Sequence, residues 1–308
     1  MIKRKALFLG VLFPIAIACS CTAEKIESDN GGEQEKNEGT GETDGYRLVW
    51  EDLFDDGSLD ESKWRIEVNG DGGGNAELQY YRSGNVSVGT DPIKKNGCLI
   101  LTAVKEDFGG KNFTSGRINT SGKFEFTHGK VEARIRLPRT ANGLWPAFWM
   151  LGADYSEVGW PRCGEIDILE MGNASGIGAG SQDRYFNGAC HWGYYINGGY
   201  PNYAKASTWS YSLQDDEYHL YTCVWDESAV KMYVDMDKYP DVQPYYEMGL
   251  TEMDGDWAVG KYFHHDFFIV LNLAVGGYFT GILNAGGITA LNNGSASMYV
   301  DFVKVYQK

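Results

Sequence analysis

The chain has 308 residues and carries a formal net charge of −15. Such acidity repels phosphate backbones, which argues against nucleic acid as a partner and favours a neutral or cationic substrate. Aromatic residues make up 14% of the chain and glycines number 40. This composition is typical of short strands joined by tight turns, and it also suits a surface on which flat ligands such as sugar rings stack.

The first 21 residues resemble the signal of a bacterial lipoprotein. Three basic residues at positions 3–5 precede an apolar stretch over residues 6–18 that is too short for a stable membrane span. Small residues then lead to a cysteine, so we expect Cys19 to receive a lipid after cleavage, with Cys21 as the alternative. The sequence therefore predicts an exported protein, anchored in the outer membrane or on the cell surface. If the signal is an ordinary cleaved one, the protein is periplasmic or secreted.

Residues 22–45 form a segment too polar to fold. They contain eight acidic residues against two lysines, and Ile26 is the only large apolar side chain. A segment of this composition buries too little apolar surface to offset the entropy lost on ordering, so we expect a flexible tether. The tether joins the anchor to a domain that begins at Tyr46 and extends to residue 308.

From Tyr46 onward the pattern changes to short β-rich runs separated by glycine clusters. In residues 130–137 the apolar side chains fall on every second position, which predicts a strand with one buried face. Many short strands with turn signals, and no long segment of helical periodicity, predict a β-sandwich or jelly roll. The runs that we expect to be strands are Gly97–Val104, Gly129–Leu137, Tyr218–Trp225, Val230–Asp235, Phe267–Val275 and Ser297–Tyr306.

Four cysteines fall within this domain: Cys98, Cys163, Cys190 and Cys223. Four cysteines allow three pairings, and the sequence does not choose among them. A disulfide is compatible with export, although a domain of this size does not need one. The sequence has no CxxC or HExxH motif, so it predicts no zinc site.

Three carboxylates lie close together in an apolar run. In residues 164–171, GEIDILEM, apolar residues alternate with Glu165 and Asp167, which indicates a strand with both acids on one face. Glu170 has the wrong parity for a regular strand, and a β-bulge near residues 168–169 would return it to the acidic face. The sequence therefore predicts a bulged strand with three acids on one side.

A row of like charges lowers the stability of a fold, but a retaining glycosidase needs closely placed carboxyl groups for catalysis. It uses two carboxyl groups about 5–5.5 Å apart, one ionised as nucleophile and one protonated as acid. With the bulge, the α-carbons of Glu165 and Glu170 are expected ~13 Å apart at ~3.3 Å per residue, and side chains that lean inward narrow the gap. We expect Glu165 to be the nucleophile, Glu170 the acid/base, and Asp167 an assisting acid that helps to hold the charge state of the nucleophile.

The same acids could instead form a calcium site or a solvated acidic strand, because hard cations also prefer clustered carboxylates. The surroundings favour catalysis. Trp145, Trp149 and Trp160 precede the acidic row and are suited to be the walls of a pyranose site, although each could equally pack in the core.

These residues resemble glycoside hydrolase family 16 on its laminarinase-like side. The resemblance rests on GEIDILE, on the preceding GLWPAFWMLG and GWPRCG, and on further segments that span nearly the whole domain. It implies a β-jelly-roll sandwich of two antiparallel sheets, a concave sheet that forms an open cleft, and endo-acting hydrolysis with retention. It also implies the bulged form of the acidic motif, with Glu165 as nucleophile, Asp167 as assisting acid and Glu170 as acid/base.

The resemblance further implies substrate-binding residues in the cleft. The matching positions are Asn75, Arg117, Trp145, Trp149, Trp160 and His191. His191 could alternatively be a packed strand residue. Some family members bind a structural calcium away from the cleft, for which Asp301 is the matching candidate, while catalysis requires no cofactor.

The substrate stays open at this level. The favoured substrate is a β-1,3- or mixed β-1,3/1,4-glucan. The alternative is that the protein is an endo-β-galactosidase acting on mucin O-glycans, poly-N-acetyllactosamine or algal galactans. The segment after His191 and the stretch 173–186 depart from the familiar laminarinase pattern, and both border the expected cleft. A non-catalytic surface glycan-binding protein is a more distant alternative, which the complete set of acids disfavours. The expected partners are the glycan and, through the lipid, the membrane, and the expected state is a monomer.

Overall fold

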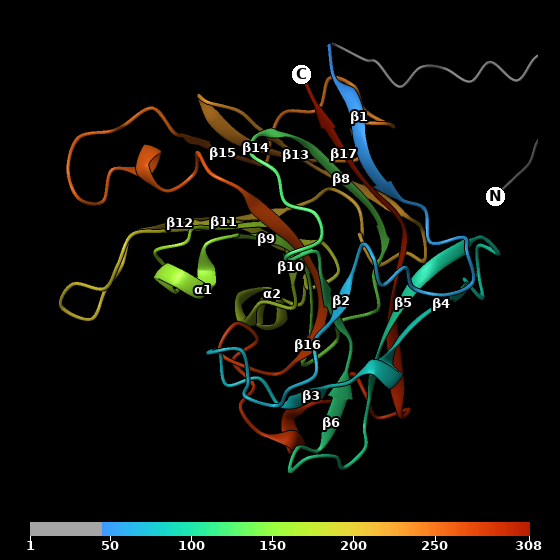
Figure 1. Ribbon diagram of the computed structural model, residues 1–308. Helices are drawn as coiled ribbons and strands as arrows, with labels where there is room; N and C mark the ends of the chain where they lie inside the picture. Colours follow the sequence, from blue (N-terminus) through green and yellow to red (C-terminus); the bar gives the residue numbers. More distant parts are fainter. Residues whose placement is uncertain (1–44) are drawn as a thin grey trace, which may run out of the picture. The chain divides into compact units, whose positions relative to one another are not determined.

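The computed structural model describes residues 45–308, and the structural statements below concern that part of the chain (Figure 1). The predicted signal, the lipidation candidates Cys19 and Cys21, and the tether as far as residue 44 lie outside the described residues and stay predictions. Within the described residues, no helix is long and apolar enough to cross a membrane.

The larger of two β-sheets has ten strands. In spatial order its main path is β15 (Tyr246–Gly249), β14 (Ala229–Val234), β13 (His219–Trp225), β8 (Gly129–Arg136), β17 (Ser295–Gln307), β5 (Gly97–Val104), β6 (Phe113–Ser115) and β3 (Gln79–Tyr81). Two strands pair outside this path, β1 (Arg47–Asp52) with β17 and β4 (Val86–Thr90) with β5. The paired strands of this sheet are antiparallel except β3 and β6, which run parallel.

The smaller sheet has seven antiparallel strands and carries the acidic motif at its centre. Its spatial order is β12 (Asn202–Thr208), β11 (Tyr185–His191), β10 (Glu165–Met171), β9 (Leu144–Gly152), β16 (Phe267–Val275), β7 (Arg117–Asn119) and β2 (Arg65–Ile66). The acids of β10 therefore have two strands on one side and four on the other.

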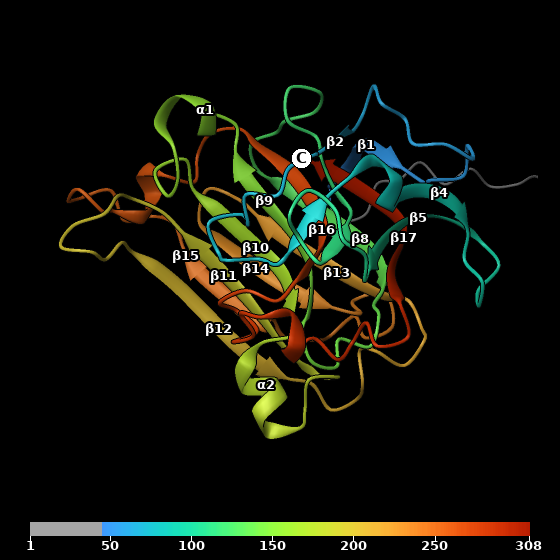
Figure 2. The same ribbon diagram turned by 90° about the horizontal axis from the view of Figure 1, so that it is seen from below.

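Helices are few and short. Over residues 45–308 the two α-helices are α1 (Tyr155–Val158) and α2 (Ala174–Ala179), and the three 3₁₀ turns are Ser83–Asn85, Val259–Lys261 and Ala285–Gly287. Helix α1 precedes β10 and α2 follows it, so the two helices lie at opposite ends of that strand (Figure 2).

The core lies between the two sheets and follows the predicted alternation. In β8 the side chains of Val131, Ala133 and Ile135 are fully buried, while the intervening charged residues are partly exposed. Every residue of strand β16 is buried. The same period of two that buries one face of each strand leaves the other face free to line a site.

The predicted fold class is confirmed. All six expected strands are present, β5 and β16 have the expected bounds, and the other four differ slightly at their ends. The parallel pair β3 and β6 is an exception to the expected antiparallel sheets, made by two short strands at the sheet edge. The four cysteines of the domain are buried and free, so none of the three possible pairings is used.

Candidate active site

One face of the seven-stranded sheet carries a cleft of about 1070 Å³. Alternate residues line it, at positions 145, 147, 149 and 151 of β9 and at 187, 189 and 191 of β11. Small-molecule pockets measure ~300–1,000 Å³. A cleft above that range, with lining residues on every strand from β12 to β2, fits an extended ligand. The predicted open cleft is therefore present.

A β-bulge in β10 brings the three acids to this cleft. The register of β10 shifts between Asp167 and Leu169 against β9, and between Asp167 and Glu170 against β11. Over this interval β10 therefore contains one residue more than its neighbours. As a result Glu165, Asp167 and Glu170 all line the cleft. The bulge predicted at residues 168–169 is confirmed.

The apolar residues of the motif face the opposite way. Ile166, Ile168 and Leu169 have no exposed surface and belong to the core between the sheets. A slip by one residue would bury the acids and expose these side chains, so the burial of the apolar face fixes which way the acids point.

Each glutamate accepts a hydrogen bond from an indole. Trp160 Nε1 donates to Glu165 Oε2 at 3.1 Å, and Trp145 Nε1 donates to Glu170 Oε1 at 3.1 Å. The Trp145 ring stacks on Phe279, with centroids 4.7 Å apart and planes at 13°. Because protein covers that ring face and only 8% of the residue is exposed, Trp145 orients Glu170 rather than offering a broad platform to a sugar.

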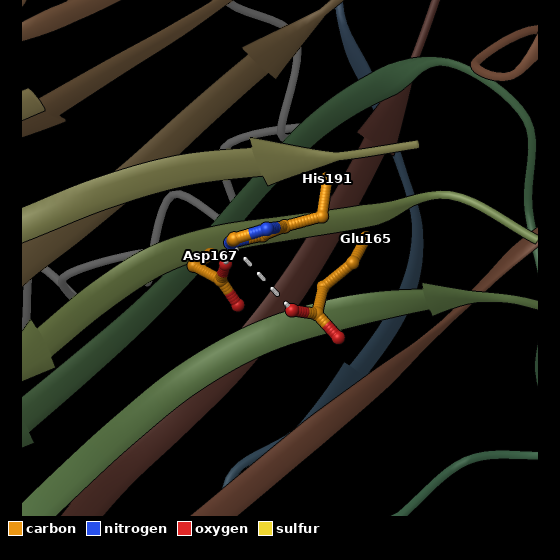
Figure 3. A group of neighbouring side chains, drawn as sticks. All are labelled: Glu165, Asp167 and His191. Atoms are coloured by element: carbon orange, nitrogen blue, oxygen red, sulfur yellow. Dashed lines mark ion pairs between the residues drawn. The ribbon is translucent and has the colours of Figure 1, made fainter. Parts of the chain in front are cut away.

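His191 faces Glu165 across the pair of strands β10 and β11 (Figure 3). Its Nε2 lies 3.4 Å from Asp167 Oδ2 and 4.0 Å from Glu165 Oε1. The side chain lines the cleft, so the structure places His191 in the site and not among packed strand residues. The sequence did not indicate this contact between His191 and Asp167.

Burial raises the pKa of all three acids. Burial and then the charge of Asp167 raise the pKa of Glu165 to about 8, against the lowering effects of His191 and Arg117. Burial also raises the pKa of Asp167 to about 8. The pKa of Glu170 is raised well above its usual range by burial and then by Asp167. Arg117 acts to lower the pKa of Glu165 and is not among the groups that lower the pKa of Glu170, so Glu165 is the more easily ionised of the two.

A polar network fixes Arg117 and Trp149 in the cleft. Arg117 Nε lies 3.0 Å from Glu67 Oε1, and Asn119 Nδ2 donates to the same oxygen at 2.7 Å. The guanidinium carbon of Arg117 lies 4.9 Å from the ring centroid of Trp149. Trp149 Nε1 in turn donates to Asn272 Oδ1 at 2.8 Å. Trp149 is therefore held by Asn272 on the neighbouring strand β16, and Arg117 by Glu67, which directly follows β2.

The rims of the cleft are aromatic. Asn75, predicted to bind substrate, lines the cleft, and its carbonyl accepts a hydrogen bond from the backbone N–H of Tyr278 at 2.9 Å. The Tyr278 side chain is 65% exposed and so is free to meet a ligand. Beside Trp160, Tyr195 and Tyr200 also line the cleft, and the rings of Trp160 and Tyr200 lie 4.7 Å apart.

Possible metal ligands occur at one place in the described residues. Glu165, Asp167 and His191 each offer a ligand atom, and these atoms lie within 4.8 Å of one another, a donor set that a divalent transition metal accepts. Asp301 does not fit calcium. Its carboxylate accepts a hydrogen bond from Asn96 and lies 3.5 Å from Arg134 Nη1, whereas calcium takes about six to eight oxygen ligands and a guanidinium competes with it.

The structure brings all nine predicted catalytic and substrate-binding residues to one cleft, and it adds others. The added residues that contact the predicted ones are Glu67, Asn272, Tyr195, Tyr200 and Phe279, and Asn119 in turn contacts Glu67. The sequence does contain a clue to Asn272, since it is the one polar residue in the run FFIVLNLAV. The sequence contains no clue to Glu67, because this residue follows the very short strand β2 in an irregular segment.

Comparisons with known proteins agree with this geometry. The model of glycosyl hydrolases family 16 matches residues 75–251. A Bacteroides ovatus mixed linkage glucan family 16 protein, solved in complex with a G4G4G3G product, is 40% identical with a TM-score of 0.72, and the match covers 83% of this chain and 99% of that chain. The beta-glucanase of Rhodothermus marinus is 32% identical over 321 residues, which cover 100% of this chain and 95% of the relative.

Other relatives are longer than this chain. The clotting factor G alpha subunit of Tachypleus tridentatus is 33% identical over 264 residues, which cover 85% of this chain, but the chain spans only 34% of that protein. Across these matches, the family that the motif predicted is confirmed. The chain belongs to glycosyl hydrolases family 16.

Proposed function

We propose that this protein is a retaining endo-β-glucanase that cleaves β-1,3- or mixed β-1,3/1,4-glucan. One observation carries the proposal: the bulged strand β10 presents Glu165 and Glu170 on the same face of a long cleft, each held by an indole N–H. The cleft continues over strands on both sides of β10. A polysaccharide can therefore lie across the acids with sugars on either side, which is the condition for cutting internal bonds.

The environment assigns the two roles. His191 and Arg117 act to lower the pKa of Glu165 and so favour its carboxylate, which assigns Glu165 as the nucleophile. Glu170 keeps its proton because burial and the charge of Asp167 raise its pKa, so it is the general acid. Asp167 is the assisting acid, and its contact with His191 places a compensating partner beside the cluster.

Hydrolysis then proceeds in two balanced steps. In the first, Glu165 attacks the anomeric carbon and forms a glycosyl ester, the glycosidic C–O bond breaks, and Glu170 donates its proton to the departing oxygen. In the second, the Glu170 carboxylate takes a proton from water, the water oxygen attacks the anomeric carbon, and Glu165 leaves as a carboxylate. Each step inverts the anomeric centre, so the product keeps the β configuration.

The substrate class rests on the site and on the relatives together. Aromatic rims and a floor of polar groups suit a neutral pyranose chain, and phosphate or sulfate groups would meet an acidic surface. The similar proteins named above include a mixed linkage glucan protein with a bound product and a beta-glucanase. We therefore propose glucan rather than galactan as the substrate.

The proposal is tested by incubating the described domain with laminarin, barley mixed-linkage glucan, mucin O-glycans and agarose, followed by product analysis. We expect oligosaccharides from the two glucans, and NMR at early times should show the β anomer. A 2-deoxy-2-fluoro glucan oligosaccharide with a dinitrophenyl leaving group should label the peptide that contains Glu165, as seen by mass spectrometry.

Glu165→Gln is the matched loss-of-function variant, and Glu247→Gln, in an exposed pair with Lys231 on the other sheet, is its control. Products from mucin or agarose alone would overturn the substrate. An initial α anomer would overturn the retaining mechanism. Unchanged turnover by Glu165→Gln would overturn the assignment of the nucleophile.

We further propose that the enzyme works outside the cytoplasm as a monomeric lipoprotein. The support is the sequence before the domain, in which Cys19 follows an apolar stretch and small residues. Radiolabelled palmitate should label the full chain in bacterial cells and fail to label Cys19→Ala. Retained labelling that disappears in Cys21→Ala would move the lipid to the alternative cysteine.

A further inference from the structure

The bulge that aims Glu170 leaves one backbone carbonyl without a place in the sheet ladder. Ile168 has no register partner in β9 or in β11, while Asp167 before it has a partner in both strands. Ile168 is fully buried, so water does not reach the carbonyl from the cleft. A buried carbonyl of this kind needs a donor from elsewhere in the protein.

The donor comes from the other sheet. Tyr245 directly precedes β15 and is anchored there by its backbone N–H, which donates to Met232 O at 3.0 Å. Its side chain is 4% exposed, and its hydroxyl donates to the carbonyl oxygen of Ile168. One tyrosine therefore spans the core from the ten-stranded sheet to the bulge in the seven-stranded sheet.

The surroundings of the Tyr245 ring are shaped to admit it. Phe186 of β11 packs edge-on against the ring, with centroids 4.7 Å apart and planes at 70°. Two residues further along that strand, Gly188 has no side chain and so leaves space for the Tyr245 ring. A Cβ at position 188 would lie 2.9 Å from Cε2 of Tyr245 and 2.8 Å from Sδ of Met232.

We propose that Tyr245 is a positioning residue for catalysis: its hydroxyl fixes the peptide of the bulge and thereby sets where the Glu170 carboxyl stands relative to Glu165. This inference rests on the proposed function of the two glutamates. The peptide after Ile168 is the start of the segment that carries Glu170, whereas Glu165 and Asp167 lie before the bulge and are held by regular pairing on both sides. Loss of the hydroxyl should therefore disturb the acid more than the nucleophile.

This selectivity separates positioning from general stability. A dinitrophenolate leaves without a proton, so hydrolysis of a dinitrophenyl glycoside does not depend on the acid in the first step, whereas cleavage of the polysaccharide does. A misplaced Glu170 therefore slows the first step for the polysaccharide but not for the dinitrophenyl glycoside, while the second step, in which Glu170 is the base, is common to both substrates. A merely less stable protein loses both activities together.

The test compares Tyr245→Phe with Tyr246→Phe. Tyr246 is the next residue, is fully buried, and donates its hydroxyl to the carbonyl of Tyr203 on the edge strand β12 at 3.0 Å. Each variant thus removes one buried tyrosine hydroxyl that bonds to the seven-stranded sheet, but only the first affects the bulge. Steady-state kinetics are measured on barley glucan, the pre-steady-state burst of dinitrophenolate is measured on the dinitrophenyl glycoside of a glucan oligosaccharide, and thermal unfolding is recorded for both variants.

We expect Tyr245→Phe to lower kcat on the polysaccharide about 10-fold or more, with KM nearly unchanged. The loss should not exceed the ~10²–10⁴-fold that a general acid supplies in full. The burst of dinitrophenolate from the same variant should keep its wild-type rate. Tyr246→Phe should keep both rates. Should Tyr245→Phe not fold, Gly188→Ala, which pushes against the same ring, should show the same selective loss.

Equal losses in kcat on the polysaccharide and in the burst rate on the dinitrophenyl glycoside, or the same kinetics for Tyr245→Phe and Tyr246→Phe, would overturn the positioning role. Those results leave the proposed function untouched as long as Glu165→Gln is inactive. Full activity of Glu165→Gln would instead overturn the proposed function itself, so the two failures are distinguishable.

Discussion

Two clusters in this protein combine carboxylates with a histidine, and they treat charge in opposite ways. One is the cleft cluster of Glu165, Asp167, Glu170 and His191. The other, which we name the remote cluster, consists of Asp215, His219 and Asp235 at β13 and the segments that flank it and β14. Burial raises the pKa of Asp167 to about 8. For Asp235, burial also acts to raise the pKa, but hydrogen bonds and charge bring it down to about 2.

The number of donors explains the difference. Asp235 is fully buried, yet it accepts from His219 Nδ1 at 2.7 Å, from the Tyr211 hydroxyl at 2.7 Å, from the backbone of Leu220 at 3.0 Å and from Lys238 at 3.2 Å. Asp167 has His191 at 3.4 Å as its ionic partner. Burial of a carboxylate is therefore stabilising or costly according to the donors around it. The cleft cluster accepts that cost because substrate must reach its acids.

The largest expected effect is that of Glu170→Gln, which should lower activity without lowering stability. Glu170→Gln should lower kcat/KM on barley glucan by ~10²–10⁴-fold, the contribution of a general acid. Its free energy of unfolding should not fall, because the change removes a buried group that carries no stabilising charge pair. Reducing-sugar assays and urea unfolding measure the two quantities. Loss of stability in step with activity would contradict the assignment of Glu170 as a catalytic group.

The reverse pattern is expected in the remote cluster. Asp235→Asn leaves His219 and Lys238 without their buried counter-charge, so the free energy of unfolding should fall by ~3–5 kcal/mol and Tm by roughly 10 °C. The kcat measured well below Tm should stay at the wild-type value, because the cluster does not line the cleft. A normal Tm would show that the hydrogen bonds to Asp235 contribute little.

The remote cluster should also give stability a pH window. Burial lowers the pKa of His219, but the hydrogen bond and charge of Asp235, and then those of Asp215, raise it overall. The stabilisation is complete below the unfolded value of ~6.5 and is lost as pH rises through the folded value. Asp235 acts in the opposite sense, because its pKa of about 2 means that stabilisation present above ~3.9 is lost as pH falls.

The cluster therefore stabilises the fold most between about pH 4 and 6.5. Urea unfolding across pH measures the effect, with His219→Gln as the comparison. The wild type should lose stability above the upper limit of this window more steeply than the variant. Parallel curves for the two proteins would mean that His219 is not protonated in the folded state at the lower pH.

The contrast also shows what a sequence reveals. Glu165 and Asp167 could be found because strand periodicity places them on one face, and the parity of Glu170 was enough to predict the bulge. The alternation of apolar residues likewise identified β8, and short β-rich apolar runs identified β5 and β16. These are local patterns, and the chain carries them within a few residues.

The parts that could not be predicted depend on distant segments. Tyr245 reaches the bulge from 77 positions away in the chain, and Asp235 meets His219 only after β13 and β14 have paired. Phe279 covers the ring of Trp145 through the loop after β16, so a tryptophan expected as a sugar wall became the partner of an acid. No spacing in the sequence encodes such contacts.

The smallest expected effect, that of Asp167→Asn on stability, gives the sharpest test of the comparison between the cleft cluster and the remote cluster. Asp167 has a folded pKa of about 8, above the unfolded value of ~3.9, so the folded state holds a proton that the unfolded state releases and stability falls as pH rises between these values. Asp167→Asn removes this cost. We expect the free energy of unfolding at pH 7 to rise by ~1 kcal/mol and Tm by ~2–4 °C, with no gain at pH 4.

Activity should change in the opposite direction to stability. The charge of Asp167 raises the pKa of both glutamates, so the variant should have a lower kcat, and both limbs of its pH profile for kcat/KM should move to lower pH. Asp167→Asn and Asp235→Asn are the same chemical change at two buried carboxylates. If both lowered the free energy of unfolding, donor number would not explain the difference between the clusters. If their signs are opposite, the cleft cluster is a place where the fold gives up stability to keep acids ready for reaction.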